Sequence, residues 1–254
     1  MLVTAAVVPG PPAFVPELMG SAAPELDELR EAADRAVSGV LEALIARSGG
    51  AGSGSGAGPA HLVVVGPGPS GEFDAAGPVS FAGFGRDVVL PALVRGKPAD
   101  PLLPTPIMVA RYLASRDIEA HPGHGPLWAG ARWITTSGDE SAMVGQRLAA
   151  DASDAGLILV ADGAACHGPK APRAQDDRAL AYDESVWAAL ASGQPGRLAQ
   201  IDAALGQELG ANGYQVWPVL AAAYVPGAGP AIGEVLWAGA PYGVGWAVAT
   251  WRRP

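Results

Sequence analysis

Short, continuously apolar runs recur along the chain and predict buried strands. Parallel strands that are covered on both faces show unbroken hydrophobic stretches rather than alternating ones. A pair of longer β-rich runs near the C-terminus predicts a closing hairpin across Pro241-Tyr242. The predicted strands are Leu2–Val8, His61–Gly66, Arg132–Thr136, Leu157–Ala161, Ile232–Ala240 and Gly243–Trp251.

Helical periodicity separates these strands. From Ser21 onward, leucine, valine and alanine recur at mostly three- and four-residue steps, and acidic residues suit the first turn of that helix. A capping box at Ser137–Glu140 opens a helix that is predicted to run to about Ser153. Further helices are predicted over 105–115, 176–190 and 197–209 and from about 214, with a loop over 121–130 and short β segments over 78–91.

Alternation of strands and helices predicts one three-layer α/β/α domain over residues 1–254. Its central sheet is expected to be mixed but mostly parallel, with the C-terminal hairpin at one side. The glycine- and serine-rich stretch Ser48–Pro59 is predicted to be a flexible surface loop inside this domain. It is not taken as a domain boundary, because the helix before it and the strand after it both have core patterns.

Composition narrows the class of protein. The net charge of −9 gives no electrostatic footprint for nucleic acid, and a hydrophobic share of 49% with seven tryptophans argues against disorder. The single cysteine, Cys166, fits a reducing compartment. No run of about 20 apolar residues is uninterrupted, and the apolar N-terminal run stops at Pro9. A cytoplasmic protein without a membrane segment is therefore expected.

Candidate chemistry gathers where the predicted strands end. Ligands of open α/β sheets bind beyond the carboxyl ends of the strands. The first two strands are followed by glycine- and proline-rich turns that contain Gly10 and Gly68, and the strand Leu157–Ala161 is followed by Asp162–His167. The loop over 121–124 adds two more imidazoles, His121 and His124.

Several of these features have plain structural explanations. Residues 66–71 fit G-x-G-x-x-G, but Pro67 and Pro69 remove backbone donors, which disfavours a phosphate cradle. The Pro122-Gly123 pair disfavours the helical i,i+4 geometry of a zinc pair at His121 and His124. Cys166 is expected to be a small buried hydrophobe rather than a nucleophile.

Taken in order, the loops resemble the class III extradiol ring-cleavage dioxygenases (the subunit-B family) and the related Memo-like proteins. That family has Pro-His-Pro-Pro after its first strand, Ser-Pro-His after its second, an Asp-His-Gly loop, Ser-Gly-Asp-Leu-Ser-His and a closing Pro-Phe-Gly-Val-Gly-Tyr. The matching segments here are Pro9–Pro12 with Pro16-Glu17, Val65–Gly68, Gly123–Gly125, Asp162–His167 and Pro241–Trp246, and a family Gly-x-Phe-Gly-x-Phe-Gly-like segment matches Val79–Gly85.

The resemblance implies a ferrous ion in a two-histidine, one-carboxylate triad in catalytic relatives. The three ligand positions fall here on Gly10, Gly68 and Ala211, none of which has a donor side chain. The acid–base histidine of the family matches His167, and its second-sphere histidine matches His124. The family iron site is therefore expected to be lost, and no metal ligand is assigned.

This pattern leaves three functions open, and whether the chain is an enzyme stays open with them. The first is a pseudoenzyme without cofactor, in which the residual cleft binds a small molecule or a protein partner and includes His121, Asp162 and Cys166. The second is a metal-free enzyme with His167 as general acid–base. The third is a dioxygenase of catechol-type substrates, with Fe²⁺ held by the relocated ligands His121, His124, His167 and a carboxylate such as Asp162. A homodimer across the tryptophan-rich C-terminal hairpin is possible.

Overall fold

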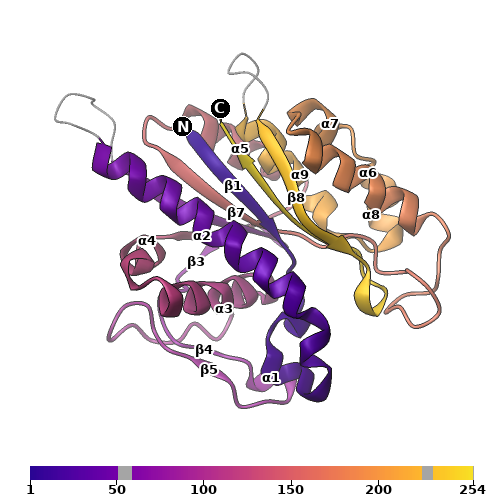
Figure 1. The fold of residues 1–254 in the computed structure, drawn as a ribbon, viewed down its shortest axis with the longest axis horizontal. Coiled ribbons are helices and arrows are strands. Elements are labelled where there is room, and N and C mark those ends of the chain that lie inside the picture. Colours follow the sequence, from indigo (N-terminus) through magenta and orange to yellow (C-terminus); the bar gives the residue numbers. More distant parts are fainter. Residues whose placement is uncertain (51–58, 225–230, 254) are drawn as a thin grey trace.

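The computed structural model describes residues 1–50, 59–224 and 231–253, which form the predicted three-layer α/β/α architecture (Figure 1). The central sheet has seven strands in the order β3-β6-β2-β7-β1-β9-β8. A separate small sheet pairs β4 with β5. The strands are β1 Leu2–Val8, β2 His61–Pro67, β3 Gly71–Phe73, β4 Val79–Ser80, β5 Val89–Leu90, β6 Arg132–Thr136, β7 Ala155–Val160, β8 Ile232–Gly239 and β9 Trp246–Arg252.

Four central strands, β6, β2, β7 and β1, run parallel, whereas β3, β9 and β8 pair antiparallel with their neighbours. Strand β7 lies between β1 and β2, and Ile158 pairs with Ala6 on one side and with Val64 on the other. All residues of β1 and β7 are buried, which explains their continuously apolar sequences. The sheet is mixed and mostly parallel, as the sequence predicts.

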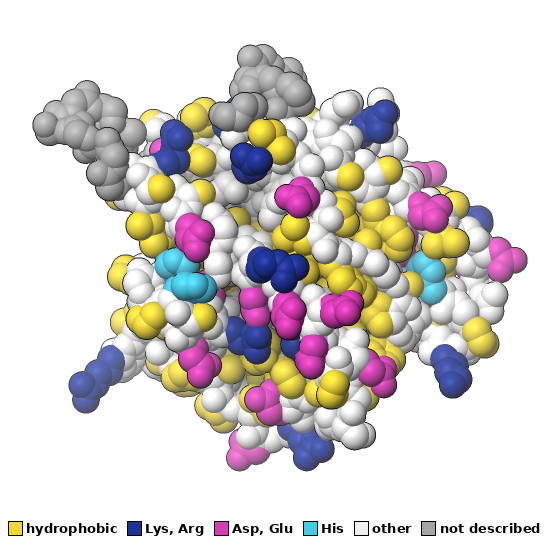
Figure 2. Space-filling view, in the orientation of Figure 1, with side chains coloured by type: hydrophobic (Ala, Val, Ile, Leu, Met, Phe, Trp, Pro, Cys, Tyr) yellow, Lys and Arg dark blue, Asp and Glu magenta, His cyan; other side chains and the backbone are white. Residues whose placement is uncertain are grey.

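One face of the sheet is covered by α2 Asp27–Gly50, α3 Thr105–Ala120 and α4 Gly125–Ala129. Alternate strand residues, among them Val8, Val64 and Ile158, point into the core under these helices. Short helices, η1 Pro12–Phe14, α1 Pro16–Met19 and η2 Gly20–Leu26, connect β1 to α2, and several acidic side chains lie on the surface of this region (Figure 2). Arg30 of α2 is buried and holds this connection, since its guanidinium donates to the carbonyl oxygens of Phe14 and Ala23 at 2.8 and 2.6 Å.

The opposite face carries the remaining helices. The intervening strand residues, among them Val7, Val65 and Leu159, point into the second core on this side. Trp251 of β9 is buried in it and donates from Nε1 to the Leu190 carbonyl oxygen at 2.7 Å. These helices are α5 Asp139–Ala150, α6 Ala179–Ser192, α7 Pro195–Ala199, α8 Ala203–Leu209 and α9 Trp217–Ala223, with the short η5 Asn212–Gln215 before α9.

Several helices begin or end at other residues than the sequence predicts. No side chain caps α5, because its N-cap is Gly138 at φ 59° and Ser137 lies one residue too early for a capping box. The helix predicted over 197–209 is two helices, because Asp202 caps α8 by accepting from the Leu205 N–H at 3.0 Å. The loop predicted over 121–130 contains η4 Pro122–His124 and α4, and α3 extends to Ala120.

The predicted flexible loop at Ser48–Pro59 is described only at its ends. Residues 48–50 continue α2, and residues 51–58 lie outside the described residues. In the C-terminal hairpin, Trp246 and Trp251 are buried in the cores of their own chain, so they do not form a free surface; the homodimer stays a prediction. None of the helices within the described residues is long and apolar enough to cross a bilayer.

Two helical glycines provide a matched test of this packing. A Cβ on Gly145 of α5 would overlap the Val219 carbonyl oxygen and approach Ala222 Cβ within 2.8 Å, whereas a Cβ on Gly39 of α2 would meet open space. We expect Gly145→Ala to lower the free energy of unfolding by about 1–3 kcal/mol through overpacking. Gly39→Ala should raise it by about 0.5–1 kcal/mol through helix propensity. Chemical denaturation measures both changes, and an equal response of the two variants would contradict the close contact between α5 and α9.

Candidate functional site

The strand order places a topological switch point at the carboxyl edge of the sheet. The connections that follow β1 and β2 lead to α2 and α3 on one face, whereas those that follow β6 and β7 lead to α5 and α6 on the other. Because β7 lies between β1 and β2, the chain leaves neighbouring strands in opposite directions. Open α/β sheets bind ligands at such a switch point. The residues that follow the three strands are Gly10, Gly68 and Asp162.

Asp162 is the central polar group at this switch point. Its carboxylate accepts from the Gly10 N–H at 2.9 Å and from Asn212 Nδ2 at 2.7 Å, and its own N–H donates to Asn212 Oδ1 at 2.7 Å. A reciprocal hydrogen-bonded pair therefore ties the end of β7 to η5. Burial raises the pKa of Asp162 above the ordinary aspartate value, against the opposing effect of the two donors.

His167 forms the second polar group, five residues further along the same loop. Its Nε2 lies 2.6 Å from Oδ2 of Asp183 in α6, and its backbone N–H donates to the Gly243 carbonyl oxygen at 3.0 Å. Asp183 is completely buried, also accepts from the Ala164 N–H at 3.0 Å, and has a pKa that burial raises. The His167 side chain is 13% exposed, so an oriented imidazole reaches the surface. A buried carboxylate that fixes a histidine ring is an arrangement suited to general acid–base chemistry.

The positions that the family resemblance assigns to iron ligands do not fit a metal. A Cβ on Gly10 would lie 2.6 Å from Val160 Cγ1 and 3.5 Å from an Asp162 carboxylate oxygen. Gly68 has φ +144°, a conformation that L side chains rarely adopt. Ala211 is buried and has only a methyl group. No side-chain donor stands at these positions, and the space beside Gly10 is filled.

Cys166 is buried, and its Sγ lies 3.5 Å from the Leu209 carbonyl oxygen. Burial raises the pKa of the Cys166 thiol, which disfavours the thiolate that a nucleophile needs. The side chain fills space beneath the loop that carries His167.

His121 and His124 do not lie at the switch point. The first turn of α3 lies beside the switch point, where Pro106 approaches the positions that a Cβ would take on Gly10 and Gly66. From there the 16 residues of α3 extend over about 24 Å, and His121 and His124 follow its last residue. There they cluster with Asp117, the one such group of potential metal ligands in the described part of the chain. The relocated ligand set of His121, His124, His167 and Asp162 is therefore not assembled.

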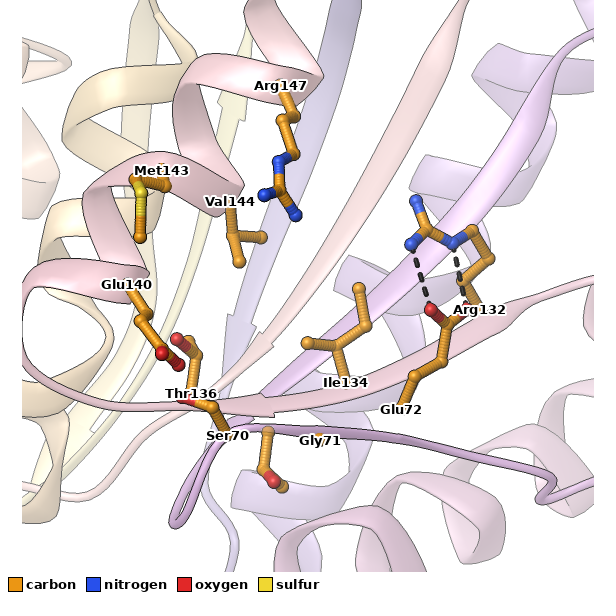
Figure 3. A pocket seen from close by; sticks show the side chains of 11 residues that line it. Ser70, Gly71, Glu72, Arg132, Ile134, Thr136, Glu140, Met143, Val144 and Arg147 are labelled. Atoms are coloured by element: carbon orange, nitrogen blue, oxygen red, sulfur yellow. Dashed lines mark hydrogen bonds and ion pairs between the residues drawn. The ribbon is translucent and has the colours of Figure 1, made fainter.

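A pocket opens near the switch point, between α5 and the β3–β6 edge of the sheet, with a volume of about 290 Å³ (Figure 3). Ile134 and Thr136 point into it from β6, and Val144 and Met143 from α5. Thr136, which lines the pocket, also contacts the residue that follows β2, because the Gly68 N–H donates to the Thr136 carbonyl oxygen at 3.3 Å.

Charged side chains surround this pocket unevenly. Arg132 donates to both carboxylate oxygens of Glu72 at 2.9 and 3.0 Å, and this pairing raises the pKa of Arg132 and lowers that of Glu72. Arg147 extends from α5 into the open space and has no carboxylate within ion-pair distance among the residues described (Figure 3). Glu140 has no lysine, arginine or histidine within ion-pair distance among the residues described.

Comparison with protein-family models finds no match, and comparison with curated proteins finds none either. The family resemblance therefore rests on the ordered loop motifs alone.

Several residues of these sites have no motif that would single them out: Asn212, Asp183, Asp117 and Arg147. Each acts through a neighbour that is distant in sequence or through a helix face, so the fold is needed to find it.

The raised pKa of Asp162 has a consequence for stability. A carboxyl group whose pKa is higher in the folded than in the unfolded state binds protons more strongly when folded, so its contribution to stability falls as the pH rises above about 4. We therefore expect the Asp162→Asn variant to become more stable relative to the wild type as the pH rises from 4 to 7. Denaturation at a series of pH values measures it, with Asp177→Asn, at an exposed position, as control. A difference that is independent of pH would contradict a raised pKa.

Proposed function

We propose that this protein is a relative of the class III extradiol dioxygenases that has lost the iron triad and binds a small carboxylic acid in the pocket between α5 and β6. The observation that carries the proposal is Arg147, a cation that faces an open, partly apolar pocket without a carboxylate partner among the described residues. A guanidinium recognises a carboxylate through paired hydrogen bonds. The pocket volume of about 290 Å³ suits a molecule at the small end of the ligand range.

The face of α5 sets the shape of the ligand. Glu140, Met143, Val144 and Arg147 recur at steps of three, one and three residues, so they line one side of the pocket. Glu140 and Arg147 stand about 10 Å apart along the helix axis, with apolar side chains between them. This pattern favours a molecule with a carboxylate at one end, an apolar body, and a hydroxyl or amine donor at the end near Glu140 and Thr136.

The packing at the switch point favours binding without iron. Asp162 and Asn212 fill the switch point with a closed hydrogen-bonded pair, and Val160 occupies the space beside Gly10. The pocket next to Thr136 of β6 lies two strands away from β7. A hydrogen bond from Ser141 Oγ to the Gln215 carbonyl oxygen at 2.5 Å connects α5 to η5, which carries Asn212.

A pair of matched compounds tests this proposal. 4-Hydroxyphenylacetate has a carboxylate, an apolar ring and a hydroxyl, and 2-(4-hydroxyphenyl)ethanol replaces the carboxylate by a neutral group. We expect the acid to bind more tightly than the alcohol, and Arg147→Ala to weaken acid binding by about 10- to 100-fold, because a hydrogen bond to a charged group contributes about 1.5–3 kcal/mol. Titration calorimetry measures the affinities.

Arg197→Ala is the matched control, since Arg197 is an exposed arginine on α7, outside the pocket lining. Its affinity for the acid should equal that of the wild type. Absence of binding to the wild type at millimolar acid, or equal affinities of the Arg147→Ala variant and the wild type, would refute carboxylate recognition by this pocket.

A second candidate function, metal-free acid–base catalysis, is favoured by the contact between His167 and Asp183. The buried carboxylate orients the ring through Nε2, which leaves Nδ1 as the nitrogen that can exchange a proton with a bound molecule. In this function His167 is the catalytic residue and Asp183 is a positioning residue.

The matched substitutions His167→Gln and Asp183→Asn test that function. If a substrate found by screening carbonyl and phenolic compounds is turned over, we expect His167→Gln to reduce kcat by about 10²–10⁴-fold, the usual contribution of general acid–base catalysis. Asp183→Asn should shift the pH profile of kcat as well as lower it. His61→Gln removes a histidine at the other end of the sheet, where Nε2 lies 3.5 Å from Asp151, and should leave kcat unchanged. Equal kcat in the wild type and the His167→Gln variant would exclude the role.

A further inference from the structure

We infer that Asp117, His121 and His124 form a binding site for a divalent transition metal of the zinc type, separate from the pocket and from His167. The site lies where α3 ends and packs beside α2. Asp117 lies in the last turn of α3, His121 is the C-cap residue of that helix, and His124 lies in η4. The inference does not depend on the proposed function.

The donor atoms already lie close together. His124 Nδ1 is 2.9 Å from Asp117 Oδ2, and His121 Nδ1 is 3.5 Å from Asp117 Oδ1. One atom from each of the three residues lies within 4.8 Å of the other two. Zinc binds imidazole nitrogen and carboxylate oxygen at about 2.0–2.2 Å, so ligand atoms around a tetrahedral ion are about 3.3 Å apart. Two imidazoles and one carboxylate form a donor set that borderline metals such as Zn²⁺, Co²⁺ and Ni²⁺ accept.

Metal binding requires one adjustment, which the exposure of His121 permits. The imidazole rings of His121 and His124 stack with centroids 4.9 Å apart and an angle of 21° between their planes. An ion lies near the plane of each ligating ring, so one ring must turn out of this stack. The His121 side chain is 44% exposed and can turn, whereas His124 is 7% exposed and stays fixed. The same exposure gives the ion its path of entry.

Outer contacts hold the carboxylate of Asp117 in place. Trp128 Nε1 donates to Oδ2 at 2.7 Å, and Ser38 Oγ of α2 donates to Oδ1 at 2.7 Å. Metal-ligating carboxylates and histidines are oriented by such second partners. Ser38 Oγ also lies 3.5 Å from His121 Nδ1, so it is placed to hold a ligating water.

The charge of the cluster favours a cation. The Asp117 side chain is only 1% exposed, and in the described ranges no lysine or arginine lies within ion-pair distance of it. Arg116, its neighbour in sequence, pairs with Asp34 instead. A buried carboxylate needs a compensating charge. Its partners here are two imidazoles and two neutral donors, and a divalent ion bound among them compensates its charge.

Zinc titration of the full chain tests the site. After treatment with a chelator, the wild type should bind one equivalent of Zn²⁺ by calorimetry and show a higher melting temperature. Co²⁺ in place of Zn²⁺ should give the visible absorption of a site with nitrogen and oxygen donors. His121→Gln should weaken Zn²⁺ binding at least tenfold, and its exposed position makes this variant safe for folding; its metal-free melting temperature checks that.

His61→Gln is the matched control. His61 lies 3.5 Å from Asp151 but has no third ligand, and it belongs to no cluster of potential metal ligands in the described residues. This variant should bind Zn²⁺ as the wild type does. Failure of the wild type to bind Zn²⁺ at micromolar concentration would overturn the inference, and so would equal binding by the wild type and a folded His121→Gln variant.

Discussion

The insertion of β7 between β1 and β2 is the constraint on which the other features depend. Strand β7 pairs in parallel with both neighbours, so Ile158 has partners on each side and the strand must be apolar on both faces. The same insertion makes the chain leave β7 toward the opposite face from β1 and β2. As a result Asp162, the second residue after β7, is delivered to the Gly10 N–H at the end of β1, and the loop that follows carries His167 to Asp183 of α6.

The absence of a side chain at position 10 is built into the packing around it. Val160 Cγ1 and the Asp162 carboxylate occupy the space where a side chain on Gly10 would lie. A histidine there would have to displace a buried, β-branched residue of the central strand, and a side chain on Gly68 would have to accept a φ of +144°.

The strands were predictable because burial on both faces leaves a strong, local signal. The run Arg132–Thr136 matches β6 residue for residue, and the antiparallel hairpin has the expected partners. Strand β3 was not predicted, since its three residues, Gly71–Phe73, are too few for a periodic pattern. In the sites, the sequence indicated Asp162 and His167 by their place after a strand, but not Asn212 and Asp183, which contact them from 50 and 16 residues away. Asp117 was not predicted as a partner of His121 and His124, because an aspartate four residues before a histidine is not a specific motif.

Three buried or half-buried aspartates show how the fold assigns different roles to the same side chain. Asp162 is surrounded by amide donors, which satisfy its oxygens but bring no charge, and burial raises its pKa. Asp183 has one amide donor and one imidazole, which suits the orientation of a ring that exchanges protons. Asp117 has a hydroxyl, an indole and two imidazoles, and one of these imidazoles is exposed. Only at Asp117 do two nitrogen ligands converge on a carboxylate that other donors already hold. The chemistry of the partners, rather than burial itself, therefore separates the buried Asp162–Asn212 pair from the proposed acid–base pair and the proposed metal site.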